Sequence, residues 1–508
     1  MMKVFKIINR IVITTTLIAL QLAWFMFILV KLTNYYTWIS VSLSVLSILI
    51  VLFIIGKDEN AAYRIGWIIL IMALPLFGGL FYLFFGNKRP VKSMRLRLNR
   101  EHRKAVDLLQ DDPSVLEEIA QLDARTLGTC RYLRENSSYP VYKNTATTYY
   151  PSGESMYQDM LCELEKAQHF IFLEYFIVRE GTMWNSILEI LSSKAAAGVD
   201  VRLIYDDFGS LFLPTDFTSQ MKKRGIKCLA FNKFRPIVSL VMNNRDHRKI
   251  LVIDGHTAFN GGINLADEYI NKVEKYGHWK DTGLRLKGEA VWSYTLMFLE
   301  MWNAFKESND SFENFKPPTH AERHVECRGY VQPFADTPLD NEAISENVYI
   351  ELLSQAKRYV YIFTPYLIVD NEMKSALCLA AKRGVDVRIV TPGIPDKRIV
   401  HRLTRSNYVP LLQAGVRIYE YTPGFMHAKS YVCDDEFAIV GTINMDYRSL
   451  YLHFECGTLL YRTDTVMDIK KDFLETILKS KEITLSDCRT GFFGSLFDAV
   501  LRALAPLF

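Results

Sequence analysis

Residues 1–87 consist of long apolar runs separated by short polar breaks. The runs at 11–30 and 37–56 contain no charged side chain, and each has 20 residues, enough to cross the hydrocarbon core of a bilayer as a helix. A third apolar run covers 66–86, where Pro75 and two adjacent glycines interrupt the helical pattern. The pattern predicts a transmembrane region with these three runs as its spans. A re-entrant or interfacial segment is the alternative for the third.

A cluster of basic side chains follows the last apolar run. Residues 88–104 hold eight Lys and Arg residues and one acidic residue, Glu101. Because Lys and Arg next to a span favour the cytoplasmic side, we expect the rest of the chain to be cytoplasmic. Residues 88–145 are then a basic juxtamembrane connector of a multi-pass cell-membrane protein. The cluster either attracts anionic headgroups to the site or serves as a topology signal alone.

Beyond the connector, strand-like runs alternate with helical ones, and the order occurs twice. "AQHFIFLEYFIV" (167–178) matches "AKRYVYIFTPYLIV" (356–369), and the next helix-to-strand passages also match, with Gly198 and Gly384 after the helices. The sequence therefore predicts an α/β fold of mixed sheets flanked by helices, duplicated within the chain. The predicted parts are a first repeat at 146–310, a linker at 311–329, a second repeat at 330–485 and a C-terminal amphipathic segment at 486–508.

Each repeat contains one copy of the pattern His-x-Lys-x4-Asp. The copies are His247, Lys249 and Asp254, then His427, Lys429 and Asp434. In a strand, residues two apart point to the same face, so the His and Lys of each copy should face one site. An imidazole can attack phosphorus or move a proton near neutral pH, and an ammonium group can hold phosphate oxygens. The pattern indicates phosphoryl transfer, with the two aspartates as more structural members that link the halves.

Further polar residues follow each copy at similar distances. Asn264 and Asn444 each lie 17 residues after the histidine of their copy, and each follows a glycine-containing turn. A neutral amide can donate to a phosphate oxygen, so we expect these residues to bind the substrate phosphate. Asp281 and Glu455 lie farther on, and we expect each to orient the histidine of its own half.

The chemistry that these residues predict is covalent. Because each half has a single motif histidine, one site requires the halves to meet face to face. One histidine would form a phosphohistidine, and the other would act as general acid and then general base. The motifs include no carboxylate cluster for Mg²⁺, and the eight cysteines show no zinc-ligand spacing, so we predict no metal and no cofactor.

The doubled motif resembles that of the phospholipase D superfamily, and the order of parts is similar to that of bacterial cardiolipin synthases. The resemblance covers nearly the whole chain, and it includes the phrases "FLEYFIV" and "TPYLIV". It implies a catalytic role for both motif aspartates. It also implies that a phosphatidyl group passes from one phosphatidylglycerol to another, which gives cardiolipin and glycerol. By analogy with other two-repeat members, His247 is the nucleophile and His427 the acid/base.

Other function classes fit less well. A phospholipase D or a phosphatidylserine synthase-type transferase uses the same half-reactions with a different acceptor or donor. A nuclease does not suit a chain with a net charge of only +4 and three apolar runs. A silent membrane scaffold does not explain two complete motifs. The C-terminal segment has an apolar stripe from Phe492 to Phe508, which predicts either an interfacial helix or a helix packed on the core.

Overall fold

The chain divides into two units in a computed structural model. The structure describes residues 37–57, 60–74, 92–233, 244–306, 310–317 and 327–507, together with scattered positions between 23 and 86. One unit contains the N-terminal helices and the end of the chain after residue 498, and the other contains residues 90–233 and 244–498. The second unit carries both motifs, and we call it the catalytic unit.

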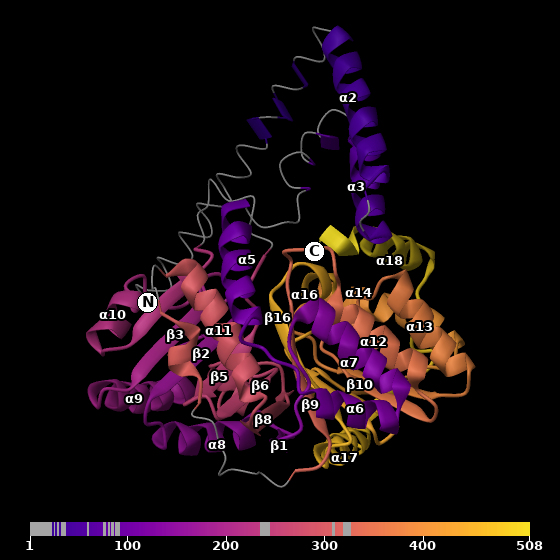
Figure 1. The fold of residues 1–508 in the computed structure, drawn as a ribbon. Helices are drawn as coiled ribbons and strands as arrows, with labels where there is room; N and C mark the ends of the chain where they lie inside the picture. The colour runs from indigo at the N-terminus through magenta and orange to yellow at the C-terminus, as the bar shows by residue number, and fades with distance from the viewer. Residues whose placement is uncertain are drawn as a thin grey trace. The chain divides into compact units, whose positions relative to one another are not determined.

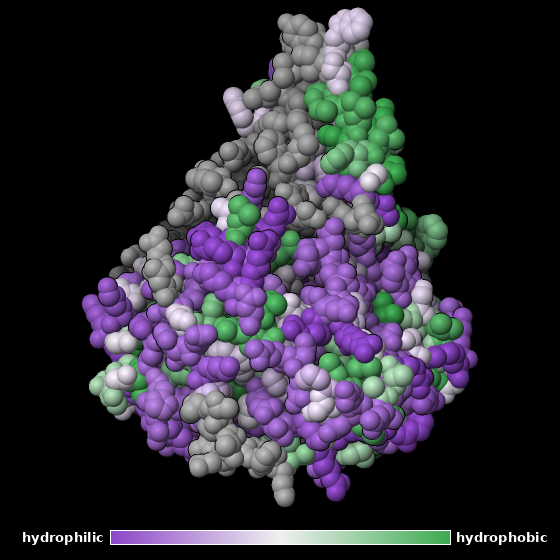
Figure 2. Space-filling view, viewed as in Figure 1, coloured by the Kyte–Doolittle hydropathy of each residue, from purple (hydrophilic) through white to green (hydrophobic). Residues whose placement is uncertain are grey.

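The N-terminal unit contains helices α2 (Thr37–Ile55) and α3 (Ala61–Ala73) (Figure 1). Asn60 caps α3, since its side chain accepts a hydrogen bond from the backbone N–H of Ala62. Many side chains of α2 are apolar and exposed, which Figure 2 shows as a hydrophobic surface over the two helices.

Two of the three predicted membrane spans overlap these helices. The run at 37–56 coincides with α2, and the run at 66–86 begins inside α3. The run at 11–30 lies almost wholly outside the described residues, as does much of the sequence after α3. Within the part of the chain that the structure describes, no helix is both long and apolar enough to cross a membrane.

The catalytic unit contains two large mixed sheets, one from each repeat. The first has seven strands in the order β1-β8-β6-β5-β2-β3-β4, and the second has eight in the order β17-β12-β11-β10-β14-β15-β16-β9. In each sheet, parallel pairs such as β2 with β3 and β10 with β11 stand beside antiparallel ones such as β5 with β6 and β14 with β15. The predicted duplicated α/β fold is confirmed.

The elements of the first half are the connector helices and the first repeat. They are α5 (Lys92–Val106), α6 (Pro113–Leu122), α7 (Ala124–Ser137), β1 (Thr145–Tyr150), α8 (Gly153–Glu165), β2 (Phe170–Tyr175), α9 (Thr182–Ala196), β3 (Asp200–Asp206), α10 (Phe217–Lys223), β4 (Lys227–Phe231), β5 (Lys249–Ile253), β6 (Thr257–Gly261), η1 (Asp267–Ile270), β7 (His278–Lys280), β8 (Gly283–Gly288), α11 (Val291–Phe305) and η2 (Phe312–Phe315).

The elements of the second half follow in the same manner. They are β9 (Tyr330–Asp336), α12 (Ile344–Gln355), β10 (Tyr359–Phe363), α13 (Asn371–Lys382), β11 (Asp386–Pro392), α14 (Arg398–Ser406), α15 (Tyr408–Gln413), β12 (Arg417–Tyr421), β13 (Gly424–Met426), β14 (Ser430–Cys433), β15 (Phe437–Gly441), α16 (Tyr447–Tyr451), β16 (Glu455–Tyr461), α17 (Thr465–Ile477), β17 (Ser480–Ile483), α18 (Phe492–Leu504) and η3 (Ala505–Leu507).

Matching helices end in the way that the sequence predicts. Gly198 follows α9 with φ +94°, and Gly384 follows α13 with φ +90°. Both lie in the left-handed region, where a side chain is strained and glycine is not. Each glycine thus ends its helix and turns the chain into a buried parallel strand.

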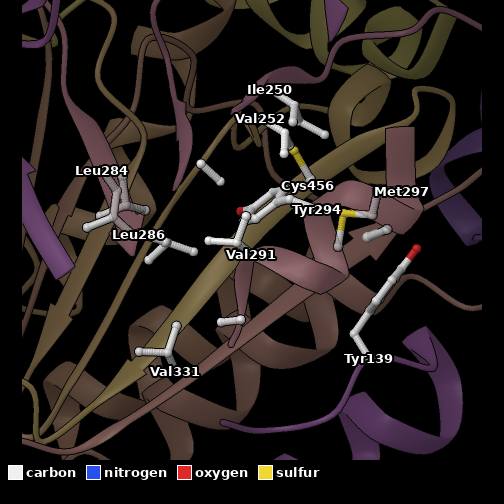
Figure 3. Close-up of a cluster of buried hydrophobic side chains, with 14 of the residues drawn as sticks. Tyr139, Ile250, Val252, Leu284, Leu286, Val291, Tyr294, Met297, Val331 and Cys456 are labelled. Carbon is white, nitrogen blue, oxygen red and sulfur yellow. The ribbon is translucent and has the colours of Figure 1, made fainter. Parts of the chain in front are cut away.

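The two sheets share one hydrophobic core, which Figure 3 shows in part. Helix α11 is buried along nearly its whole length and contributes Val291, Tyr294 and Met297. Val252 of the first sheet and Cys456 of the second belong to the same cluster. The Tyr294 hydroxyl also lies 2.8 Å from Thr458 Oγ1, so the core links the two halves by polar as well as apolar contacts. The two halves therefore face each other, as the single histidine per half predicts.

Candidate active site

Each motif histidine lies just before a central strand and is held there by the other half. The backbone N–H of His247 donates to the carbonyl of Phe454 at 2.9 Å, and that of His427 donates to the carbonyl of Lys280 at 2.7 Å. Strand β7 also pairs in parallel with β13, which immediately precedes His427. The main chain thus fixes both histidines at the junction of the halves.

The carboxylates that orient the histidines are exchanged between the halves. His247 Nδ1 lies 2.8 Å from Glu455 Oε1, and His427 Nδ1 lies 2.6 Å from Asp281 Oδ2. The expectation that each carboxylate orients the histidine of its own half is wrong. The reason is topological, because the segment before β16 runs beside His247 while the segment after β7 runs beside His427. Both carboxylates are fully buried, and they favour Nδ1 as the proton-bearing nitrogen.

Neighbouring groups hold these carboxylates in place. The Thr442 hydroxyl donates a short hydrogen bond to Glu455 Oε2, and the Thr282 N–H donates to Asp281 Oδ1 at 2.9 Å. A Cβ at Gly262 would lie 2.0 Å from Asp281 Oδ1. This glycine therefore makes room for the orienting carboxylate.

The two motif lysines are buried next to the histidines. Lys249 Nζ donates to the His247 carbonyl at 2.6 Å, and Lys429 Nζ lies 2.9 Å from His427 Nδ1. Burial lowers the pKa of Lys249 to about 8 and the pKa of Lys429 to about 7. Without an anion, the site therefore holds its lysine charges at an energetic cost that a bound phosphate would offset.

Burial and the lysines act on the histidines in the same direction. Burial, followed by the charge of Lys429, lowers the pKa of His427 to about 4. Burial, followed by the charge of Lys249, lowers the pKa of His247 well below its usual value. Burial alone would raise the pKa of Asp281, but His427 and Lys429 lower it overall. At neutral pH these pKa shifts favour neutral imidazoles and an ionised Asp281.

The two predicted phosphate-binding asparagines differ in their surroundings. Asn264 accepts from the N–H of Ile177 at 3.0 Å and donates to the Tyr269 hydroxyl at 2.7 Å, so its amide braces the turn after β6. Asn444 Oδ1 is buried and has no hydrogen-bond partner among the described residues. The equal spacing of the two residues therefore does not give them equal contacts.

Both motif aspartates end their strands and hold the backbone of their own half. Asp254 accepts hydrogen bonds of 2.8 Å from the N–H groups of Gln168, His169 and Phe170. Asp434 accepts from the equivalent segment 357–359. The expected structural role agrees with these contacts, but the expected link between the halves is wrong. A strand-ending carboxylate reaches the start of the neighbouring strand of its own sheet.

A third histidine, His453, was not singled out by the sequence patterns. Its ring centroid lies 5.5 Å from that of His247, and its Nδ1 lies 3.8 Å from Glu455 Oε1. His247, His453 and Glu455 offer ligand atoms within 4.8 Å of one another, which is a donor set that could hold a metal ion. The sequence does mark this position, because His453 lies two residues before Glu455. In the first half, Trp279 lies two residues before Asp281.

These features define a class of enzyme: a duplicated α/β protein whose halves each contribute a His-Lys pair to one buried phosphoryl-transfer site. A family model described as cardiolipin synthase, PLD-like domain, matches residues 160–280 and 349–477. A second model, phospholipase D-nuclease N-terminal, matches residues 44–87.

Relatives with known names extend the match over almost the whole chain. A cardiolipin synthase from Alkalihalophilus pseudofirmus is 34% identical, over 93% of this chain and 95% of that protein. Another, from Geobacillus kaustophilus, is 35% identical, over 92% of this chain and 93% of that protein. The chain belongs to the cardiolipin synthase family of the phospholipase D superfamily.

A solved structure supports the fold independently. The phosphatidylserine synthase of Haemophilus influenzae superposes with a TM-score of 0.56 and 14% sequence identity, over 75% of this chain and 98% of that one. At this identity the likeness concerns the fold alone.

Proposed function

We propose that this phosphatidyl transferase converts two molecules of phosphatidylglycerol into cardiolipin and glycerol through a phosphohistidine. One observation carries the proposal: two imidazoles, each within hydrogen-bond distance of a buried carboxylate from the other half, lie beside two buried lysines. Membership of the cardiolipin synthase family supports the choice of lipid acceptor over water.

In the first half-reaction, one imidazole gives its electron pair to the phosphorus of the donor lipid. An N–P bond forms, the P–O bond to glycerol breaks, and the second imidazole, protonated, gives its proton to the departing oxygen. The second histidine is neutral in the empty site, so it must gain that proton when the substrate binds. The negative charge of a phosphodiester raises the pKa of a nearby imidazole and so supplies the cause.

In the second half-reaction, a hydroxyl of another phosphatidylglycerol attacks the phosphohistidine. The same second histidine now takes the hydroxyl proton, the new P–O bond forms and the N–P bond breaks, which returns the first imidazole as it began. Lys249, Lys429, Asn444 and the remaining N–H of Asn264 would donate to the non-bridging oxygens as charge builds on them. His247 as the nucleophile and His427 as acid/base is the assignment that analogy favours.

The N-terminal region would hold the catalytic unit at the membrane. We propose three N-terminal spans and a cytoplasmic catalytic unit, on the basis of the apolar runs and the basic segment after them. Helix α5 carries much of that segment, including Arg97, Arg103 and Lys104. Such a helix would lie near anionic headgroups and raise the local concentration of an anionic lipid substrate.

The first experiment uses the purified full-length protein in liposomes with phosphatidylglycerol alone, with divalent metals removed by a chelator. Mass spectrometry should find cardiolipin and free glycerol in equal amounts. Phosphatidic acid with glycerol would indicate a phospholipase D instead, and turnover only with a cytidine-activated lipid and serine would indicate a phosphatidylserine synthase-type transferase. As a control, the His427→Ala variant should give no product.

A further inference from the structure

The two half-sites differ at one pair of matching positions. Trp279 lies two residues before Asp281, and its ring centroid is 5.1 Å from that of His427. His453 lies two residues before Glu455, and its ring centroid is 5.5 Å from that of His247. The pseudo-symmetric fold thus places one side chain against each motif histidine, an indole on one side and an imidazole on the other.

Trp279 has its polar atom satisfied and its ring enclosed. Its Nε1–H points to Asp281 Oδ2 at 3.4 Å, and its ring packs on Tyr269 and Phe425 at centroid distances of 4.7 and 4.9 Å. This position forms an apolar wall next to His427, and it offers no free hydrogen-bonding atom to a ligand.

His453 is in the opposite situation. Its side chain is only 10% exposed, yet neither ring nitrogen has a hydrogen-bond partner among the described residues. Glu455 Oε1, at 3.8 Å from Nδ1, is beyond hydrogen-bond distance. A buried polar group without a partner costs about 1–3 kcal/mol, so a ligand that supplied the partner would bind more tightly here.

The two ring nitrogens of His453 narrow the chemistry of that ligand. A neutral imidazole has one donor nitrogen and one acceptor nitrogen, and both are buried without a partner among the described residues. A phosphodiester oxygen can satisfy the donor but not the acceptor, because it carries no proton. In the proposed substrate, the groups that can donate to a nitrogen are the hydroxyls of the glycerol headgroup.

We propose that His453 binds a hydroxyl of the glycerol headgroup and thereby selects a polyol as the alcohol that enters and leaves the site. The inference rests on the proposed function, and it concerns a hydroxyl that does not itself react, since the donor headgroup carries two of these. His453 is then a specificity-determining residue of the His247 side of the site, and Trp279 is its apolar counterpart on the other side.

The test is a competition between two alcohols for the same phosphatidyl group. Full-length protein in liposomes of phosphatidylglycerol is given labelled glycerol and 1-propanol, which has the same carbon skeleton without the two further hydroxyls. Labelled phosphatidylglycerol and phosphatidylpropanol are then measured together. Their ratio depends on the second half-reaction alone, because both products arise from one intermediate. It is also independent of how much protein is folded.

We expect His453→Leu to lower the preference for glycerol about tenfold, which is the effect of losing one buried hydrogen bond, while transfer to 1-propanol continues. His453→Asn keeps one donor and one acceptor group and should retain most of the preference. Trp279→Phe is the matched control at the mirror position. It should change the total rate through Asp281 and leave the ratio as in the unaltered protein.

An unchanged ratio in His453→Leu would overturn the inference. So would evidence that His453 is a metal ligand, namely chelator-treated protein that regains activity with Zn²⁺ and fails to do so once His453 is replaced. The proposed function is tested separately by cardiolipin formation from phosphatidylglycerol alone. Cardiolipin formation with an unchanged ratio rejects only His453, whereas a lowered ratio without cardiolipin formation rejects only the lipid acceptor.

Discussion

At the residue scale, each histidine depends on the other half of the chain for its tautomer. Glu455 lies in the second repeat and orients His247 of the first, while Asp281 lies in the first and orients His427 of the second. Neither repeat therefore contains both a motif histidine and the carboxylate that orients it. This exchange makes the assembled unit, and not either repeat alone, the chemically competent species.

Replacing Glu455 with Gln should act on the histidine of the other repeat. The amide cannot stabilise a proton on His247 Nδ1 as a carboxylate does, so we expect kcat to fall about 100-fold or more. Nitrogen NMR of labelled imidazole should show that the His247 signals shift. The matched variant is Asp281→Asn, which should shift the His427 signals. A shift of His427 in Glu455→Gln, with His247 unmoved, would contradict the exchanged pairing.

The depressed lysine pKa values predict that anion binding takes up protons. The pKa of Lys429 is about 7 and that of Lys249 is about 8. At about pH 8, both lysines are therefore partly neutral before an anion binds. A bound anion favours the charged form and raises both pKa values, so binding at such a pH must add protons. Below pH of about 6 the lysines are already charged and contribute no uptake.

Calorimetry measures this proton uptake when the binding of a soluble phosphodiester is repeated in buffers of different ionisation enthalpy. The charge of the phosphodiester itself is constant over this pH range. Lys429→Met should reduce the number of protons taken up at the higher pH. Equal heats in all buffers would show that neither the lysines nor the second histidine gains a proton when the anion binds.

At the element scale, strands β7 and β13 connect the repeats next to the site. They pair in parallel, with Gly424 opposite His278 and Met426 opposite Lys280. A Cβ at Gly424 would lie 2.2 Å from the His278 carbonyl oxygen, so the close approach of the strands requires glycine. Because His427 follows directly, this pairing sets the distance from His427 to Asp281.

Gly424→Ala should therefore reduce activity without a change at any side chain of the site. Forcing the strands apart displaces His427 from Asp281, and we expect kcat to fall at least about 10-fold. Gly128→Ala in α7 is the control, because its Cβ would meet nothing within 4 Å. It should keep full activity and raise stability by about 0.5–1 kcal/mol through helix propensity. A fully active Gly424→Ala enzyme would show that the pairing tolerates separation.

The strand-ending aspartates should affect stability more than chemistry. Asp254 has a positive φ of 51° and accepts three N–H groups from segment 168–170. Asp254→Ala leaves these groups unpaired and should cost about 3 kcal/mol, seen as a lower Tm in thermal unfolding. Asp254→Asn tolerates the left-handed backbone and keeps one acceptor, so its loss should be smaller. A large fall in kcat at unchanged Tm would instead support a direct catalytic role.

At the scale of the whole molecule, α18 presents apolar side chains outward. Phe492 and Phe493 are 80% and 84% exposed, and the carboxylate of Asp498 pairs with Arg402 Nε at 2.6 Å. The ion pair holds the middle of α18 against α14 of the catalytic unit, while the side chains of Phe492 and Phe493 stay exposed. Exposed aromatic side chains at a helix end suit insertion into the bilayer interface.

Replacing Phe492 and Phe493 together with Ser should weaken this contact. We expect several-fold lower activity on phosphatidylglycerol vesicles and unchanged activity on a short-chain, monomeric analogue. Leu478→Ser is the control, because Leu478 is an apolar side chain with 86% exposure elsewhere in the catalytic unit. A loss on both substrates would indicate damage to the fold, and no loss on either would remove α18 from membrane binding.

The features that depend on local order follow from the amino-acid sequence. The doubled His-x-Lys-x4-Asp motif, the matching strand runs and the glycines after α9 and α13 predict two α/β repeats around one site. These patterns are local because strand alternation and helix termination depend on neighbouring residues. The identities of Asp281 and Glu455 as orienting groups were likewise predictable from residue type.

The sharing of these groups between the repeats depends on the fold of the whole catalytic unit. Which carboxylate meets which histidine depends on the pairing of β7 with β13 and on the contact of Phe454 with His247, and residues far apart in the sequence make both. The separate surroundings of Asn264 and Asn444, and the place of His453 against His247, arise in the same way. A spacing along one strand fixes which residues share a face, but the packing of two sheets fixes what that face meets.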